Sequence, residues 1–239
     1  MTTSVEPIHV AGVEQNHPGN RLIFSVALIA AAALAYQLLL MRLLSIIQWQ
    51  HVVGMIISLA LLGHGASGTV LSLLGPRALR RFQPLYVANA FGFALGALVC
   101  FALAQRVPFN ALELAWNPRQ GLGLAAIYLL LALPFFCAAN CIGLSFIRWG
   151  GSIPRLYRAD LAGAALGALS IILLLFLASP ALCLQLVALC GIAAAVLATS
   201  RLYVVMLAGL LSAALLTPWA TAAIAPRLSD YKGLPRQLQ

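Results

Sequence analysis

Long apolar stretches dominate this sequence and limit what it can fold into. Seven of them follow one another with short links, at 22–47, 52–74, 85–105, 121–147, 157–178, 181–199 and 202–225. A helix needs about 20 mostly apolar residues to cross a bilayer. The stretches are continuous and lack the period-two alternation of a membrane β-barrel. The sequence therefore predicts an all-α, polytopic helical membrane bundle with about seven transmembrane helices.

Charged residues are too scarce to cover a water-soluble domain. They make up 8% of the 239 residues, whereas hydrophobic residues make up 63%; soluble domains are roughly 25% charged. The net charge of +9 is spread over the short links between stretches. The tendency of basic residues to stay on the cytoplasmic side explains this spread better than nucleic-acid binding. We therefore expect the lipid bilayer as a partner, and no nucleic acid.

The basic links alternate along the chain and predict a topology. Arg77, Arg80 and Arg81 follow the second stretch, and further arginines follow the fourth and sixth stretches. These links are expected on the cytoplasmic side, together with the N-terminus, of a bacterial inner membrane. We predict a disordered polar leader at 1–20, a membrane domain at 21–225 and a tail or linker at 226–239. Seven spans would leave that tail on the outer side.

The cysteines predict packing rather than chemistry. All five lie inside apolar stretches, at Cys100, Cys137, Cys141, Cys183 and Cys190. An odd number of cysteines in such positions argues against a disulfide framework. Free cysteine behaves as a small hydrophobic residue, and no second pair or histidine completes a ligand set. The sequence therefore predicts no metal site and no cofactor.

Asp160 is the one acidic residue at the edge of an apolar stretch. A carboxylate at membrane depth is costly, so it is by default a functional or a paired group. In one interpretation it complements the helix dipole at the start of its span and pairs with Arg155 or Arg158. In the other it forms a site for a cation or substrate inside the bundle. Both interpretations stay open from sequence.

Four further polar residues are candidates for such an intramembrane site. Gln37 needs a hydrogen-bond partner and is best explained as a residue that forms a hydrogen bond between helices. Arg42 is near the end of the first stretch and can extend its side chain to the interface. His64 is either packed in the bundle or available to relay a proton. Asn140 completes the set in the fourth stretch.

Glycines that suit close helix packing occur in three stretches. Small residues let membrane helices approach closely, so these motifs predict packing within the bundle, with self-association as the alternative. The glycines are Gly63, Gly65, Gly68, Gly92, Gly96, Gly163 and Gly167.

The run Tyr157-x-x-Asp160-Leu161-x-Gly163-Ala164-x-Leu166-Gly167 resembles the membrane region of bacterial spermidine synthase-like proteins with an N-terminal multi-span domain. The segments at 35–44, 58–69 and 229–234 also resemble that family. The resemblance implies a non-catalytic membrane domain that anchors or positions an aminopropyltransferase-like domain, in cis or in trans. It also implies a site for a small polar or cationic ligand.

The sequence departs from this family at two points. Gln37 stands where the family usually has glutamate, so an ionisable role is in doubt at that position. The sequence also lacks the glycine-rich nucleotide-type segment and the carboxylate pair of the catalytic domain. We therefore expect no enzymatic activity and no catalytic residue in this chain. Two alternatives stay open, a transporter of polyamine-like cations and a structural subunit of a membrane complex.

Overall fold

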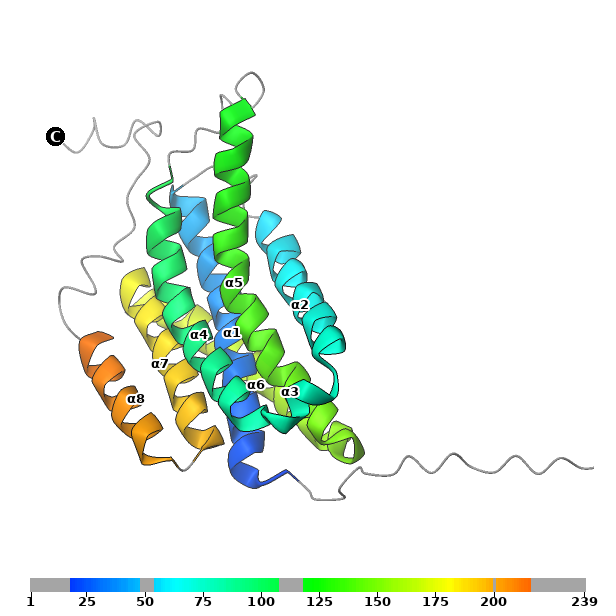
Figure 1. The fold of residues 1–239 in the computed structure, drawn as a ribbon. Helices are drawn as coiled ribbons and strands as arrows, with labels where there is room; N and C mark the ends of the chain where they lie inside the picture. Colours follow the sequence, from blue (N-terminus) through cyan, green and yellow to red (C-terminus); the bar gives the residue numbers. More distant parts are fainter. Residues whose placement is uncertain (1–17, 48–53, 108–117, 200, 216–239) are drawn as a thin grey trace, which may run out of the picture.

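The computed structural model describes residues 18–47, 54–107, 118–199 and 201–215, and every regular element within these ranges is a helix (Figure 1). This confirms the predicted all-α class. The helices are α1 Asn20–Ile47, α2 Met55–Leu74, α3 Pro76–Arg80, α4 Phe82–Ala104, α5 Pro118–Arg148, η3 Gly150–Ser152, α6 Ile153–Leu177, α7 Pro180–Ala198 and α8 Leu202–Leu215.

Six of these helices are long and apolar enough to cross a membrane, namely α1, α2, α4, α5, α6 and α7. They match the first six predicted stretches. The seventh stretch begins as α8, whose 14 residues would extend about 21 Å, short of the roughly 30 Å of a hydrocarbon core. The rest of that stretch lies outside the described residues, as do the predicted leader and tail.

Helix α3 was not predicted, because the segment between the second and third stretches has the composition of a link. Gly75 ends α2 with a φ of 47°, a conformation that favours glycine. Pro76 then occupies the first turn of α3, where its missing N–H is not needed. The result is a short helix that turns the chain from α2 into α4.

Helix α1 is at the centre of the bundle. It packs most extensively against α6 and α7, and it also contacts α5 and α2. Helix α5 in turn packs against α4 and α2, whereas α8 packs against α7 at the edge (Figure 1). The central place of α1 follows from its side chains: Val26, Ile29, Tyr36 and Leu39 are fully buried.

Helices α1 and α6 run in the same direction and touch through small residues. A Cβ atom placed on Gly163 would collide with the backbone of Ala27, and one on Gly167 would collide with that of Ala31. Both pairs advance by four residues, which fixes the parallel arrangement. This pair of glycines therefore packs inside the bundle.

The glycines of α2 behave differently from one another. A Cβ atom on Gly63 would come within 2.7 Å of the Cβ atom of Phe135 on α5, so this glycine is needed for close packing. At Gly65 and Gly68 the same atom would meet nothing within 4 Å. The predicted packing face of α2 is therefore wrong at these two positions.

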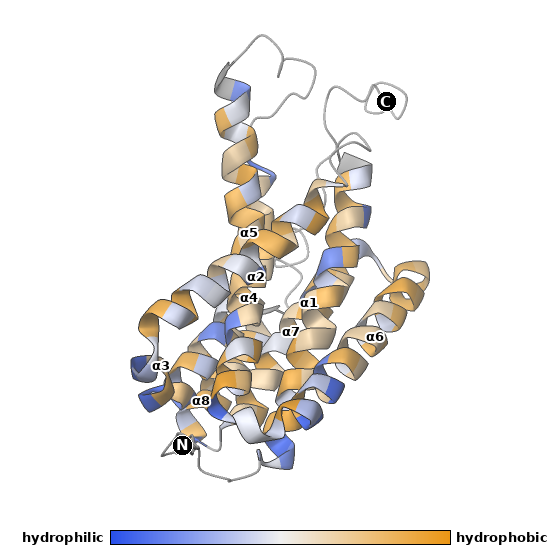
Figure 2. Cartoon of the chain, turned by 90° about the vertical axis from the view of Figure 1, so that its right-hand side faces the viewer, coloured by the Kyte–Doolittle hydropathy of each residue, from blue (hydrophilic) through white to orange (hydrophobic). Residues whose placement is uncertain are grey.

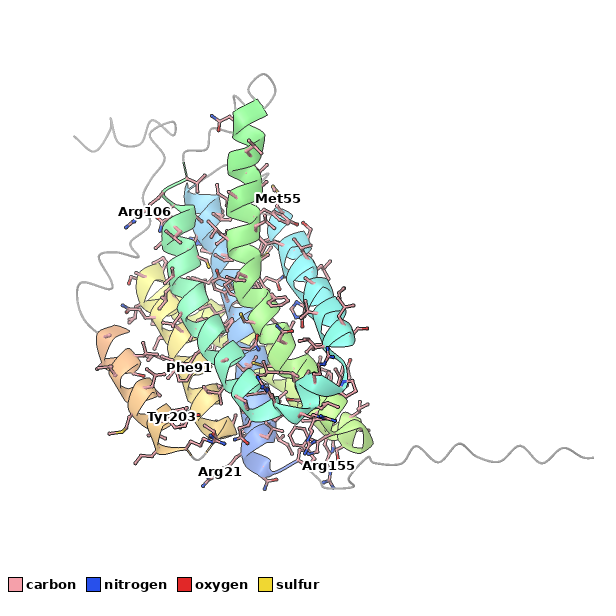
Figure 3. All side chains as sticks on the ribbon, viewed as in Figure 1. Arg21, Met55, Phe91, Arg106, Arg155 and Tyr203 are labelled. Atoms are coloured by element: carbon pink, nitrogen blue, oxygen red, sulfur yellow. The ribbon has the colours of Figure 1, made fainter. Side chains whose placement is uncertain are left out.

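Charged side chains gather at the two ends of the bundle. Arg21 and Arg155 lie at one end, whereas Arg106 lies at the other with Met55 (Figure 3). The hydropathy view shows apolar residues along the lengths of the helices and polar residues mainly near their ends (Figure 2). We call the end that carries Arg21 and Arg155 the arginine-rich end.

Candidate functional site

Asp160 is the only acidic residue within the described ranges, and it is half-buried on α6. Helix α6 begins at Ile153, so Asp160 lies about 10 Å along the helix axis from its start. The predicted span began four residues later, at Tyr157, and placed Asp160 one turn from the helix start. The helix dipole acts mainly within the first turn. The sequence interpretation that relied on the dipole is therefore wrong.

The carboxylate of Asp160 has no hydrogen bond or ion pair among the residues that the structure describes. Arg155 and Arg158 are exposed on the preceding turns of α6 and do not pair with it. Among the residues that the structure describes, His64 on α2 is the group that acts on it electrostatically. Asp160 and His64, on helices that are distant in sequence, are therefore close enough for the charge of one to act on the other.

His64 is exposed on α2, and its orientation is set by its own helix. The ring atom Nδ1 lies 2.8 Å from the carbonyl oxygen of Ala60, one turn earlier. A carbonyl oxygen can only accept a hydrogen bond, so Nδ1 is the donor in this contact. In the neutral ring, Nε2 is then left as an acceptor.

A chain of side-chain hydrogen bonds connects three helices next to His64. Ser67, one turn after His64 on α2, donates to Oδ1 of Asn140 on α5 at 2.7 Å. Nδ2 of Asn140 donates to Oδ1 of Asn89 on α4 at 3.1 Å, and Asn89 donates to the carbonyl oxygen of Leu85 at 2.8 Å. Asn140 is only 5% exposed. The predicted candidate Asn140 is therefore the centre of a buried polar network.

Gln37 and Arg42 lie apart from this group. Gln37 is ten residues beyond Ala27 on α1, and Ala27 contacts Gly163 of the parallel helix α6. That separation is about 15 Å along the helix axis, and Asp160 precedes Gly163. Arg42 is farther along α1 and is exposed. The structure therefore does not bring either residue to Asp160.

A second polar contact was not anticipated from sequence. Ser25 on α1 donates to the carbonyl oxygen of Ala194 on α7 at 2.7 Å. Its hydroxyl oxygen also lies 2.8 Å from the hydroxyl oxygen of Tyr86 on α4. Because the Ser25 hydrogen is used in the bond to Ala194, Tyr86 is the donor in this second bond. All three residues are buried. The contact joins three helices, so its role is to fix their positions.

An apolar groove in the bundle differs in kind from the polar group around Asp160. It has a volume of about 520 Å³ and runs between α1, α6 and α7. Small residues such as Ala27, Ala31 and Gly167 line it, with Arg21 at its edge. Such a surface suits hydrocarbon chains and offers little for polar chemistry.

The described cysteines are all free thiols, and the described ranges hold no cluster of three or more residues suited to a metal ion. No protein-family model matches the chain, and no curated protein or solved structure shows significant similarity to it. The function is therefore argued from the polar group around Asp160.

Proposed function

We propose that this chain is a multi-span membrane protein that binds a small organic cation, such as a polyamine, at Asp160 between α2 and α6. One observation carries the proposal: a half-buried carboxylate on a membrane helix has no hydrogen bond or ion pair among the described residues. A charge in this position is costly unless it is paired. A cationic ligand would supply the missing partner.

The surrounding groups suit an ammonium group. A protonated amine has three hydrogens to donate and accepts none. The carboxylate of Asp160 and Nε2 of neutral His64 are both acceptors. A protonated His64 would instead compete with the cation for Asp160.

The resemblance to spermidine synthase-like membrane proteins is consistent with a polyamine ligand but adds no geometric support. The anchoring of an aminopropyltransferase-like domain, which that resemblance implies, stays a prediction from sequence motifs. The proposal for a cation site does not depend on it, because it rests on Asp160 and His64 alone.

Spermidine binding to the purified full chain in a neutral detergent, measured by calorimetry, tests the proposal. Asp160→Asn keeps the shape of the side chain and removes its charge. A hydrogen bond to a charged group is worth about 1.5–3 kcal/mol, so we expect affinity to fall by about tenfold or more. Gln37→Ala is the matched control, because this polar residue lies away from Asp160, and it should bind as the unmodified chain does.

His64→Lys provides an independent arm of the experiment. A lysine at this position places a charge that stays positive at neutral pH near Asp160 and should abolish spermidine binding. If the Asp160→Asn variant and the unmodified chain bound spermidine with equal affinity, the proposed site would be rejected. Circular dichroism of each variant establishes that it retains its helices.

A further inference from the structure

Three arginines line one pocket at the arginine-rich end of the bundle. The pocket has a volume of about 360 Å³ and is located where α2 passes through α3 into α4. Its lining consists of Leu74, Arg77, Ala78, Arg80, Arg81 and Leu85. It is separate from Asp160 and from the apolar groove, and the sequence interpretation assigned its arginines only to topology.

The fold holds these arginines in one place. Ala78 is only 3% exposed and packs with Leu71 of α2 and Leu144 of α5, which fastens α3 to the bundle. With Ala78 directed inward, Arg77 and Arg80 are three residues apart and share another face of the short helix. Arg81 follows directly and is also exposed. The short helix and the residue that follows it therefore present three guanidinium groups together.

The positive charge of this cluster is not balanced from within the described part of the chain. The guanidinium groups of Arg77, Arg80 and Arg81 make no hydrogen bond or ion pair with its residues. Guanidinium groups are planar, always charged and well matched to the oxygen atoms of a phosphate, which they bind through paired hydrogen bonds. Three of them around a pocket therefore indicate a phosphate-type anion.

The apolar part of the lining identifies the source of that phosphate. Leu74 ends one membrane-spanning helix and is 41% exposed, and Leu85 lies in the first turn of another. The pocket is thus at the boundary where lipid headgroups meet hydrocarbon. We propose that Arg77, Arg80 and Arg81 bind the phosphate of an anionic membrane phospholipid, whose acyl chains contact Leu74 and Leu85.

Binding of a short-chain phosphatidylglycerol to the full chain in neutral detergent, measured by calorimetry, tests this site. Short-chain phosphatidylcholine is the comparison lipid. Basic residues near a membrane surface contribute about 1 kcal/mol each. The triple variant Arg77→Gln, Arg80→Gln, Arg81→Gln should therefore bind phosphatidylglycerol at least about tenfold more weakly. Phosphatidylcholine should bind weakly to both proteins.

A second triple variant distinguishes binding at the arginine pocket from a general effect of positive charge on lipid binding. Arg155→Gln, Arg158→Gln and Arg201→Gln remove the same charge from the same end of the bundle but leave the pocket intact. This variant should keep its affinity within about twofold, because none of the three arginines lines the pocket and salt weakens the effect of exposed charges. Equal weakening of the two variants would overturn the proposal.

Two further arms complete the test. Inorganic phosphate at the concentration of the lipid should not displace phosphatidylglycerol; full displacement would show a site for free anions and overturn the lipid assignment. Arg80→Lys keeps the charge, the helix and the fold but loses the paired donors. It should weaken phosphatidylglycerol binding severalfold. Unchanged affinity in both this variant and the pocket triple variant would also reject the site.

Discussion

At the scale of single residues, the charge on Asp160 has a consequence for stability as well as for binding. Without a ligand, its half-buried carboxylate is not compensated by a hydrogen bond or an ion pair within the described ranges. Asp160→Asn removes the charge and keeps the volume. Because an unpaired charge at membrane depth is unfavourable, we expect the thermal midpoint in detergent to stay equal or rise. A clear fall would mean that Asp160 is paired in the free protein.

Substitution of Asn140 should instead lower the stability of the chain. It accepts from Ser67 and donates to Asn89, so Asn140→Ala removes the acceptor of the Ser67 hydroxyl group and the donor to Oδ1 of Asn89. Hydrogen bonds between membrane helices average about 0.6 kcal/mol, so the loss of two should lower the free energy of unfolding by about 1 kcal/mol. Unfolding of the detergent-solubilised chain by a denaturing detergent measures this.

A double-mutant cycle of Ser67 on α2 and Asn140 on α5 is the control for the unfolding measurement. In the double variant Ser67→Ala, Asn140→Ala, the loss should be smaller than the sum of the two single losses, because both remove the same bond. Strict additivity would contradict the hydrogen bond between Ser67 and Asn140.

Sequence alone identified which residues were unusual but not which of them meet. Asp160, His64 and Asn140 stand out because they are polar residues in apolar surroundings. The pairing of Ser67 with Asn140 depends on how α2 crosses α5, which no local pattern specifies. Gln37 stood out equally, yet the parallel packing of α1 and α6 separates it from Asp160.

At the scale of helices, the contact between α1 and α6 gives the sharpest prediction. A methyl group at Gly163 would collide with the backbone of Ala27, which cannot yield as a flexible side chain can. Overpacking of this kind typically costs about 1–3 kcal/mol. Gly163→Ala should therefore lower the thermal midpoint of the chain in detergent.

Gly65 provides the matched control on α2. The same substitution there meets nothing within 4 Å, and alanine is favoured over glycine in a helix by about 1 kcal/mol. Gly65→Ala should therefore leave the thermal midpoint unchanged or raise it. A fall of equal size in both variants would show that the effect is general to glycine and not specific to the contact with α1.

Helix positions were predictable because each apolar stretch is long enough to cross the bilayer. The predicted and observed boundaries of the six long helices differ by four residues or fewer. The largest difference is at the start of α6, where Ile153 and Pro154 open the helix before the apolar stretch begins. That one extra turn changed the interpretation of Asp160. Apolar length therefore finds a membrane helix but not the point where it starts.

At the scale of the whole molecule, the distribution of arginine connects the fold to its orientation. Arg21 and Arg155 are at the same end, and Arg106 is at the opposite end (Figure 3). The chain directions place α3, with Arg77, Arg80 and the adjoining Arg81, at the end that carries Arg21 (Figure 1). Basic links are retained on the cytoplasmic side. We therefore predict that the arginine-rich end, and with it the proposed lipid pocket, faces the cytoplasm.

Labelling of single introduced cysteines in intact bacterial cells tests this orientation. The native cysteines all lie within helices and are buried or half-buried; replacing them with alanine gives a clean background. Arg106→Cys should react with a membrane-impermeant thiol reagent, whereas Arg155→Cys should react only after the cells are opened. The reverse pattern would place the arginine-rich end outside. Anionic lipid is concentrated in the cytoplasmic leaflet of many membranes. The reverse labelling pattern would therefore also remove the topological argument for a lipid headgroup at Arg77, Arg80 and Arg81.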